Sequence, residues 1–154
     1  MGKPTQEDIE RLGRYFAIEH NNKFWSLSEV AEEKGDQLQL LEYAFGSLSH
    51  WKQVGTQDNI ELANLAVARA LAVNHSALSV EYAQLAYDHF DGKGANWIQA
   101  FTNAVLSHAL LICGKNDQAA LLYQQAESFR GKLDEGDLSV FDATFQTIPQ
   151  LQIG

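Results

Sequence analysis

Proline is confined to the two ends of this 154-residue chain, at Pro4 and Pro149. A proline inside a helix removes a backbone hydrogen bond and costs about 3 kcal/mol. The stretch between the two prolines can therefore form long helices, and none of it shows the alternation of apolar and polar residues that is typical of a β-strand. The sequence predicts an all-α protein of about eight helices, mostly joined by short turns that make neighbouring helices antiparallel.

The charge balance narrows the choice of partners. Eleven Lys and Arg residues stand against twenty Asp and Glu residues, which gives a formal net charge of −9. Binding to nucleic acid or to an anionic membrane surface requires clustered basic residues. The composition therefore argues against both, and the length is that of one domain with one core.

Motifs for chemistry are missing from the sequence. The single cysteine, Cys113, excludes an intrachain disulfide, and its apolar surroundings predict a buried thiol. The sequence has no metal-ligand or phosphate-binding motif, so no metal and no cofactor is expected. Because it also lacks a signal-peptide pattern and a membrane-length apolar run, a cytoplasmic protein is expected.

A spacing pattern around Gly114 is more informative. Small or aromatic residues follow this glycine at +5, +9 and +12, namely Ala119, Tyr123 and Ala126. The same template fits around Gly35, where these positions are Leu40, Ala44 and Ser47. Small residues let two antiparallel helices approach closely, while larger residues fill the gaps between them. The chain is therefore expected to use one type of helix hairpin more than once.

A third hairpin fits between these two, with its turn at Asn74–His75. In its second helix, Ala83 and Ala86 take the places of Tyr123 and Ala126. The predicted units are residues 22–53, 59–91 and 96–130. Separate helices over residues 5–20 and 138–146 are expected to cap the apolar end faces that a stack of repeats exposes.

This pattern resembles the tetratricopeptide repeat (TPR), in which helix hairpins stack into an α-α superhelix. The stretch His50–Asn59, HWKQVGTQDN, together with the units after it, is similar to a group of bacterial TPR-like proteins. That resemblance implies a fold and no activity. The predicted turns are 40 and 39 residues apart, whereas the TPR period is roughly 34 residues, so the helices or their connections are expected to be longer.

The resemblance also implies a concave groove lined by the first helix of each unit. With Gly35, His75 and Gly114 as turns, the position six residues earlier is Glu29, Arg69 and His108. Trp25 and Phe101 lie on the same helical faces. The candidate binding residues are therefore Trp25, Glu29, Arg69, Phe101 and His108.

Each of these residues also has a structural interpretation. Glu29 and Arg69 would form a partly exposed ion pair worth about 0–1 kcal/mol. Trp25 and Phe101 would be core residues, and His108 would be an interior histidine with a satisfied hydrogen bond.

We therefore expect a non-catalytic protein-interaction module that binds a peptide or helix in its groove. A first alternative is a small-molecule sensor or an enzyme with a closed pocket around Glu29, Arg69 and His108. A second is a homo-oligomer that stacks through an end helix. A pocket with a shifted pKa would favour the first alternative, and an apolar patch on an end helix the second.

Overall fold

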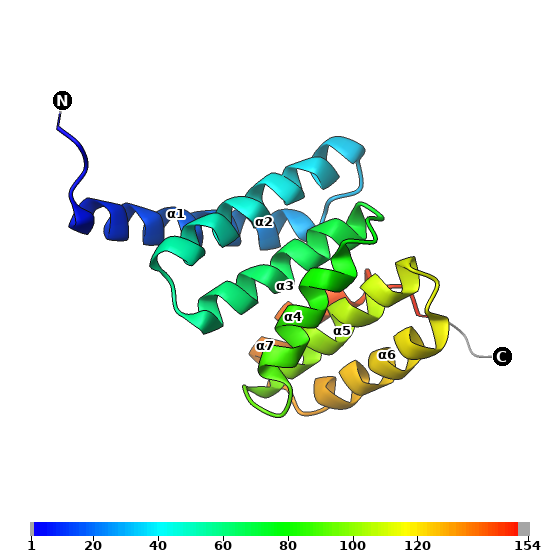
Figure 1. Cartoon of the computed structure of the whole chain (residues 1–154). Coiled ribbons are helices and arrows are strands. Elements are labelled where there is room, and N and C mark those ends of the chain that lie inside the picture. Colours follow the sequence, from blue (N-terminus) through cyan, green and yellow to red (C-terminus); the bar gives the residue numbers. More distant parts are fainter. Residues whose placement is uncertain (1, 151–154) are drawn as a thin grey trace.

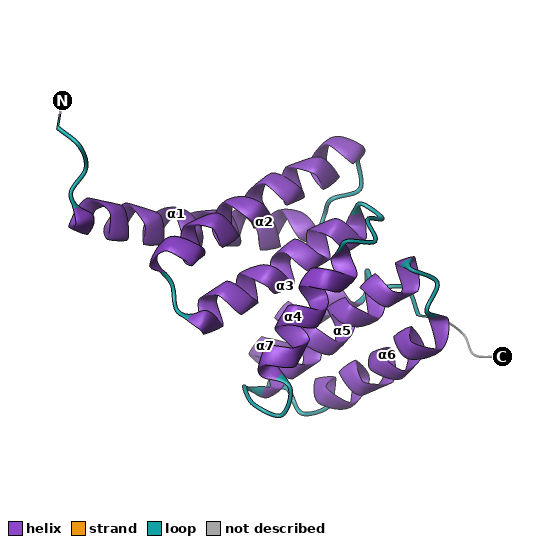
Figure 2. Cartoon of the chain, viewed as in Figure 1, coloured by secondary structure: helices purple, strands orange, loops and turns teal. Residues whose placement is uncertain are grey.

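The structure is a computed structural model that describes residues 2–150. Seven α-helices and no strand occur in this part of the chain, so the all-α prediction is confirmed (Figures 1 and 2). The helices are α1 Gln6–Ser28, α2 Lys34–Val54, α3 Gln57–Val73, α4 Ser79–Phe90, α5 Asn96–Ile112, α6 Asn116–Arg130 and α7 Glu135–Phe145. None of them combines the length and the hydropathy needed to cross a membrane.

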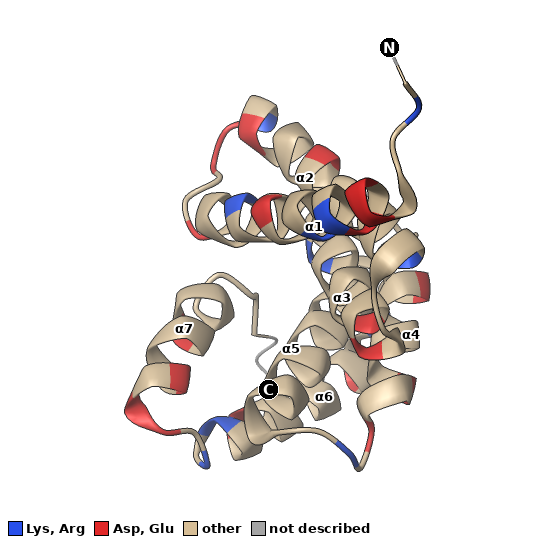
Figure 3. Ribbon diagram, turned by 90° about the vertical axis from the view of Figure 1, so that its left-hand side faces the viewer, with Lys and Arg blue, Asp and Glu red and all other residues tan. Residues whose placement is uncertain are grey.

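Three helix pairs, α1–α2, α3–α4 and α5–α6, make the most extensive contacts. The first helices of these pairs also contact one another, α1 with α3 and α3 with α5, and so form a continuous inner layer. Helix α7 packs against α5. It lies on the side of the inner layer that faces away from α4 (Figure 3).

The small residues of the predicted hairpins are buried as expected. Ala44, Ser47, Ala83, Ala86, Ala119 and Ala126 are all buried within the helix pairs. Two serine hydroxyls join the helices of a pair directly: Ser47 Oγ donates to the carbonyl of Ala17 at 2.8 Å, and Ser107 Oγ donates to that of Ala119 at 2.6 Å. The spacing therefore identified real helix–helix contacts.

Two of the three predicted turns are confirmed. His75 and Gly114 have positive φ angles of 56° and 74°. Each is followed by a backbone N–H that bonds back to the last turn of the helix, Ser76 to Leu71 at 2.9 Å and Lys115 to Leu110 at 3.0 Å. These are the six-to-one bonds of the Schellman motif, which turns the chain sharply after a helix.

The predicted boundaries at the N-terminal end are wrong. Residues 5–20 are not a separate capping helix, because α1 continues without a break from Gln6 to Ser28. No residue near His20 disrupts a helix strongly enough to end it there, since asparagine costs well under 1 kcal/mol in a helix interior. The predicted turn residue Gly35 lies inside the first turn of α2, without a positive φ.

The thiol of Cys113 also departs from the prediction. The residue follows α5 directly and is exposed, although the sequence places it in an apolar run. Its neighbour Leu110 is buried, because that position still faces the core. The helix end at Ile112 turns Cys113 out of the core.

Candidate functional site

A cavity of about 260 Å³ lies on the inner layer, between α1, α3, α5 and α7. Its lining residues are Asn21, Trp25, Glu29, Leu62, Trp97, Phe101, Val140 and Thr144. A volume of this size holds a side chain or a small group rather than a drug-sized ligand. The cavity is therefore suited to one anchoring group.

Three aromatic rings form the wall of the cavity. The Trp25 and Phe101 ring centroids are 5.4 Å apart with planes at 69°, and the Trp97 and Phe101 centroids are 6.3 Å apart at 81°. Both contacts have the edge-to-face geometry that aromatic pairs prefer. The three rings therefore form one packed aromatic cluster at the cavity.

Helix α1 contributes one stripe of the lining. Asn21, Trp25 and Glu29 are four residues apart, so they lie above one another on a single helical face. Trp25 is partly buried, whereas Glu29 comes directly after the helix end and is exposed. Among residues 2–150 the carboxylate of Glu29 forms no ion pair. It is therefore available to a ligand.

Helix α7 forms the opposite wall and is firmly attached. The fully buried ring of Phe141 contacts Phe101 at 5.1 Å and Phe145 at 4.8 Å between centroids. Arg130 Nε and Nη2 donate to Asp142 Oδ1 and Oδ2, both at 2.7 Å. The same hydrogen bonds hold the pKa of Asp142 below its usual value. The cavity is thus bounded by fixed elements.

Arg69 lies on the inner layer beyond the cavity, under the segment that follows α7. Its side chain is 2% exposed, and Nη2 donates to Thr147 Oγ1 at 2.6 Å and to the carbonyl of Ser28 at 3.4 Å. Nε is buried without a hydrogen-bond partner in the described part of the chain. Burial lowers the pKa of Arg69 to about 10, which leaves the guanidinium charged at neutral pH.

His108 is buried as well, with 7% of its surface exposed. Burial, followed by the positive charges of Arg69 and His75, lowers its pKa to about 4. The imidazole is therefore neutral at pH 7. Within residues 2–150 its Nδ1 has no hydrogen-bond partner, which differs from the satisfied interior histidine that the sequence suggested.

The structure thus divides the five candidate residues into two groups. Trp25, Glu29 and Phe101 line the cavity, whereas Arg69 and His108 lie buried and are absent from its lining. The ion pair suggested for Glu29 and Arg69 does not form.

Sequence reasoning missed several lining residues. Trp97 stands one helical turn before Phe101, so the helical spacing contained its signal. Val140 and Thr144 come from α7, and no pattern in the sequence places that helix on the inner layer.

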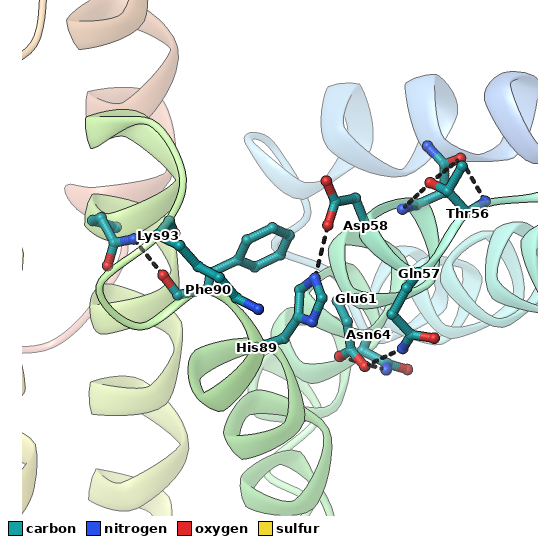
Figure 4. Close-up of polar contacts among 10 residues, drawn as sticks. Thr56, Gln57, Asp58, Glu61, Asn64, His89, Phe90 and Lys93 are labelled. Carbon is teal, nitrogen blue, oxygen red and sulfur yellow. Dashed lines mark hydrogen bonds and ion pairs between the residues drawn. The ribbon is translucent and has the colours of Figure 1, made fainter.

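A second polar cluster joins the start of α3 to the end of α4 (Figure 4). His89 Nε2 and Asp58 Oδ1 are 2.7 Å apart, and the buried carboxylate of Glu61 accepts from Gln57 at 2.8 Å and from Asn64 at 3.0 Å. These polar groups use their hydrogen bonds within the chain. Of these contacts, the one between His89 and Asp58 joins α4 to α3, whereas the bonds of Glu61 lie within α3.

The chain matches no protein-family model, and it has no significant match among curated proteins or solved structures. Within residues 2–150, no three His, Cys, Asp or Glu side chains are placed to hold a metal ion.

Proposed function

We propose that this protein is a non-catalytic TPR-like interaction module that binds a peptide segment of a partner protein on its inner layer. The observation that carries the proposal is the aromatic cavity between α1, α3, α5 and α7, with the unpaired Glu29 carboxylate in its lining. Buried aromatic pockets are where protein interfaces concentrate their binding energy. One side chain of the peptide enters this cavity, and flanking residues lie along the layer.

The enzyme alternative has less support. Of its three residues, only Glu29 lines the cavity. Arg69 is buried beneath Thr147, and His108 is 7% exposed, so a substrate in the cavity does not reach them. The lowered pKa of His108 results mainly from burial rather than from a partner in a reactive cluster. A binding role therefore accounts for the geometry better than catalysis does.

Two features support the TPR-like superhelix as part of the proposal. The α3–α4 and α5–α6 pairs turn through the same Schellman geometry at His75 and Gly114. All three pairs bury small residues at the spacing that the sequence repeats.

Selection from a random peptide library tests the proposal. Val140→Trp would fill the cavity from an exposed position on α7, and Ser139→Trp, at the adjacent exposed position outside the cavity, is the matched control. Selected peptides are expected to bind the wild type and Ser139→Trp, and to lose at least about tenfold in affinity for Val140→Trp. If no peptide is selected, or if Val140→Trp binds equally well, the proposal is wrong.

A second candidate is self-association through α1. Its N-terminal half exposes a set of large apolar side chains, 40–56% accessible, namely Ile9, Leu12, Tyr15, Phe16 and Ile18. Exposed apolar patches of this kind often mark interaction surfaces. Sedimentation analysis of the wild type and of Tyr15→Ser tests it: a concentration-dependent dimer that the variant loses supports this candidate, and a monomer at all concentrations rejects it.

A further inference from the structure

The cavity has the chemistry of a cation site. Trp25, Trp97 and Phe101 line it, and cations bind the electron-rich faces of aromatic rings, most strongly those of tryptophan. The chain itself contains one example of this contact, because the Arg14 guanidinium lies 5.6 Å from the centre of the Trp51 ring. The walls of the cavity therefore attract more than apolar groups.

One charged side chain lines the cavity within residues 2–150, and it is the carboxylate of Glu29. The carboxylate lies at the C-terminal end of α1, where the helix dipole is negative and where the last turn contains no basic residue. Further acidic residues, Glu32 and Glu33, follow in the connection to α2 (Figure 3). A cation entering here meets the Glu29 carboxylate, while the Arg69 guanidinium already binds the Ser28 carbonyl at the end of α1.

The buried cation Arg69 does not pair with Glu29. The Arg69 guanidinium bonds to the Ser28 carbonyl and to Thr147, and it is not part of the lining. The formal net charge of −9 favours a basic partner over the whole molecule as well. Since no side chain among residues 2–150 forms an ion pair with Glu29, a ligand can supply the complementary positive charge.

We propose that the cavity receives the guanidinium group of an arginine in the partner peptide. This inference rests on the proposed function and names the side chain that anchors the peptide. A guanidinium is planar and weakly hydrated, so it stacks on aromatic rings while its N–H groups bond to a carboxylate. Glu29 accepts those hydrogen bonds, Trp25 and Trp97 provide the stacking faces, and Asn21 offers a further polar contact.

Titration with small probes tests the site directly. The probes are N-acetyl-arginine N-methylamide, the same compound built on citrulline, which is isosteric but neutral, and tetramethylammonium. The readout is the set of three tryptophan indole N–H signals in a proton–nitrogen NMR spectrum. The arginine probe is expected to shift the signals of Trp25 and Trp97, and to leave that of Trp51, which lies outside the cavity, unchanged.

Two variants test whether the Glu29 carboxylate binds the arginine probe. Glu29→Gln removes the carboxylate from the lining, and Glu32→Gln removes an exposed carboxylate of the same connection that does not line the cavity. Glu29→Gln is expected to weaken binding of the arginine probe about fivefold to tenfold, to about the level of the citrulline probe. Glu32→Gln is expected to change it less than twofold.

Three results would overturn the assignment. Equal binding of the arginine and citrulline probes would show a neutral anchor. Tighter binding of tetramethylammonium than of arginine would show a site for quaternary ammonium groups. Unchanged Trp25 and Trp97 signals at saturating concentrations of all three probes would show that the cavity binds none of these groups.

The outcome is separable from that of the peptide selection. If selected peptides depend on the cavity but contain no arginine, the module binds peptides and the arginine assignment is wrong. If the arginine probe binds as expected while no peptide is selected, the cation site stands and the peptide-binding function is wrong.

Discussion

The two ends of the inner layer share their supporting helices but differ in what covers them. At one end, Trp25, Leu62 and Phe101 line a cavity that is accessible from outside. At the other end, Arg69 occupies a later turn of α3 and is 2% exposed, with Thr147 of the segment after α7 bonded to it. His108 occupies a later turn of α5 and is 7% exposed. The helical face alone therefore does not determine whether a side chain is available for binding.

The charged residues at the two ends also differ in whether a ligand can reach them. Glu29 is exposed and solvated at the cavity, so it can exchange water for a ligand. Arg69 is charged but buried, and its hydrogen bonds go to Ser28 and Thr147 within the chain. The first group is a candidate for recognition and the second is a structural residue. Four predictions, from the largest effect to the smallest, examine this contrast.

Loss of the aromatic packing that holds α7 on the inner layer should lower the free energy of unfolding most. Phe141 is fully buried and contacts both Phe101 and Phe145. Phe141→Ala is expected to lower the free energy of unfolding by about 3–5 kcal/mol, because it leaves a cavity beneath α7. Urea denaturation followed by circular dichroism measures this, with the exposed Val140→Ala as control. A loss below about 1 kcal/mol would mean that α7 contributes little to the stack.

Replacement of Arg69 should lower the stability of the fold, because this residue packs in the interior. Arg69→Ala is expected to lower the free energy of unfolding by about 2–4 kcal/mol, because the buried stem leaves a void. Arg69→Met fills most of that volume without a buried charge, and should recover at least half of the loss. Equal stability of Arg69→Ala and the wild type would return this residue to the candidate binding site.

The pKa of His108 predicts a pH dependence of stability. The folded value is about 4 and the ordinary value is 6.5, so the unfolded chain takes up the proton first as the pH falls. Stability is therefore lost as the pH falls from about 6.5 towards 4, by at most about 3–4 kcal/mol from this residue.

Urea midpoints at pH 7 and pH 4.5 measure that effect. His108→Gln is expected to have a smaller difference between the two midpoints than the wild type has. His50→Gln replaces a histidine of α2 that is not among the groups lowering the pKa of His108, so it serves as control and should behave like the wild type. An identical pH dependence in all three proteins would show that His108 is protonated equally easily in the folded and unfolded chains.

The smallest effect is expected at the open end. Glu29→Gln should change the free energy of unfolding by no more than about 0.5 kcal/mol, because the carboxylate is exposed and has no ion-pair partner among residues 2–150. Thermal unfolding of Glu29→Gln and Arg69→Ala, measured under the same conditions, compares the two losses of stability directly. A loss as large as that of Arg69→Ala would remove the distinction between the two ends.

Much of the helix packing could be predicted from the sequence. The alanines at the predicted positions are buried, and the turns at His75 and Gly114 are present, because helical spacing and positive-φ turns are local properties. The prediction of a turn at Gly35 was wrong, because a glycine also fits within the first turn of a helix. Only contacts with neighbouring elements decide whether it forms a turn or belongs to the helix.

The candidate site was less predictable for the same reason. Trp25 and Phe101 could be placed on helical faces from their spacing. The burial of Arg69 depends on Thr147, which lies 78 residues further along the chain. A contact of that separation leaves no periodic signal around either residue.

The position of α7 has a consequence for the order in which the site is assembled. The α1–α2, α3–α4 and α5–α6 pairs each join neighbouring segments, so they can form as the chain leaves the ribosome. The cavity needs Val140 and Thr144 opposite Trp25, and those residues emerge more than a hundred positions later. During synthesis the inner layer is therefore exposed before α7 packs against it, and the candidate site is completed only after the hairpins have formed.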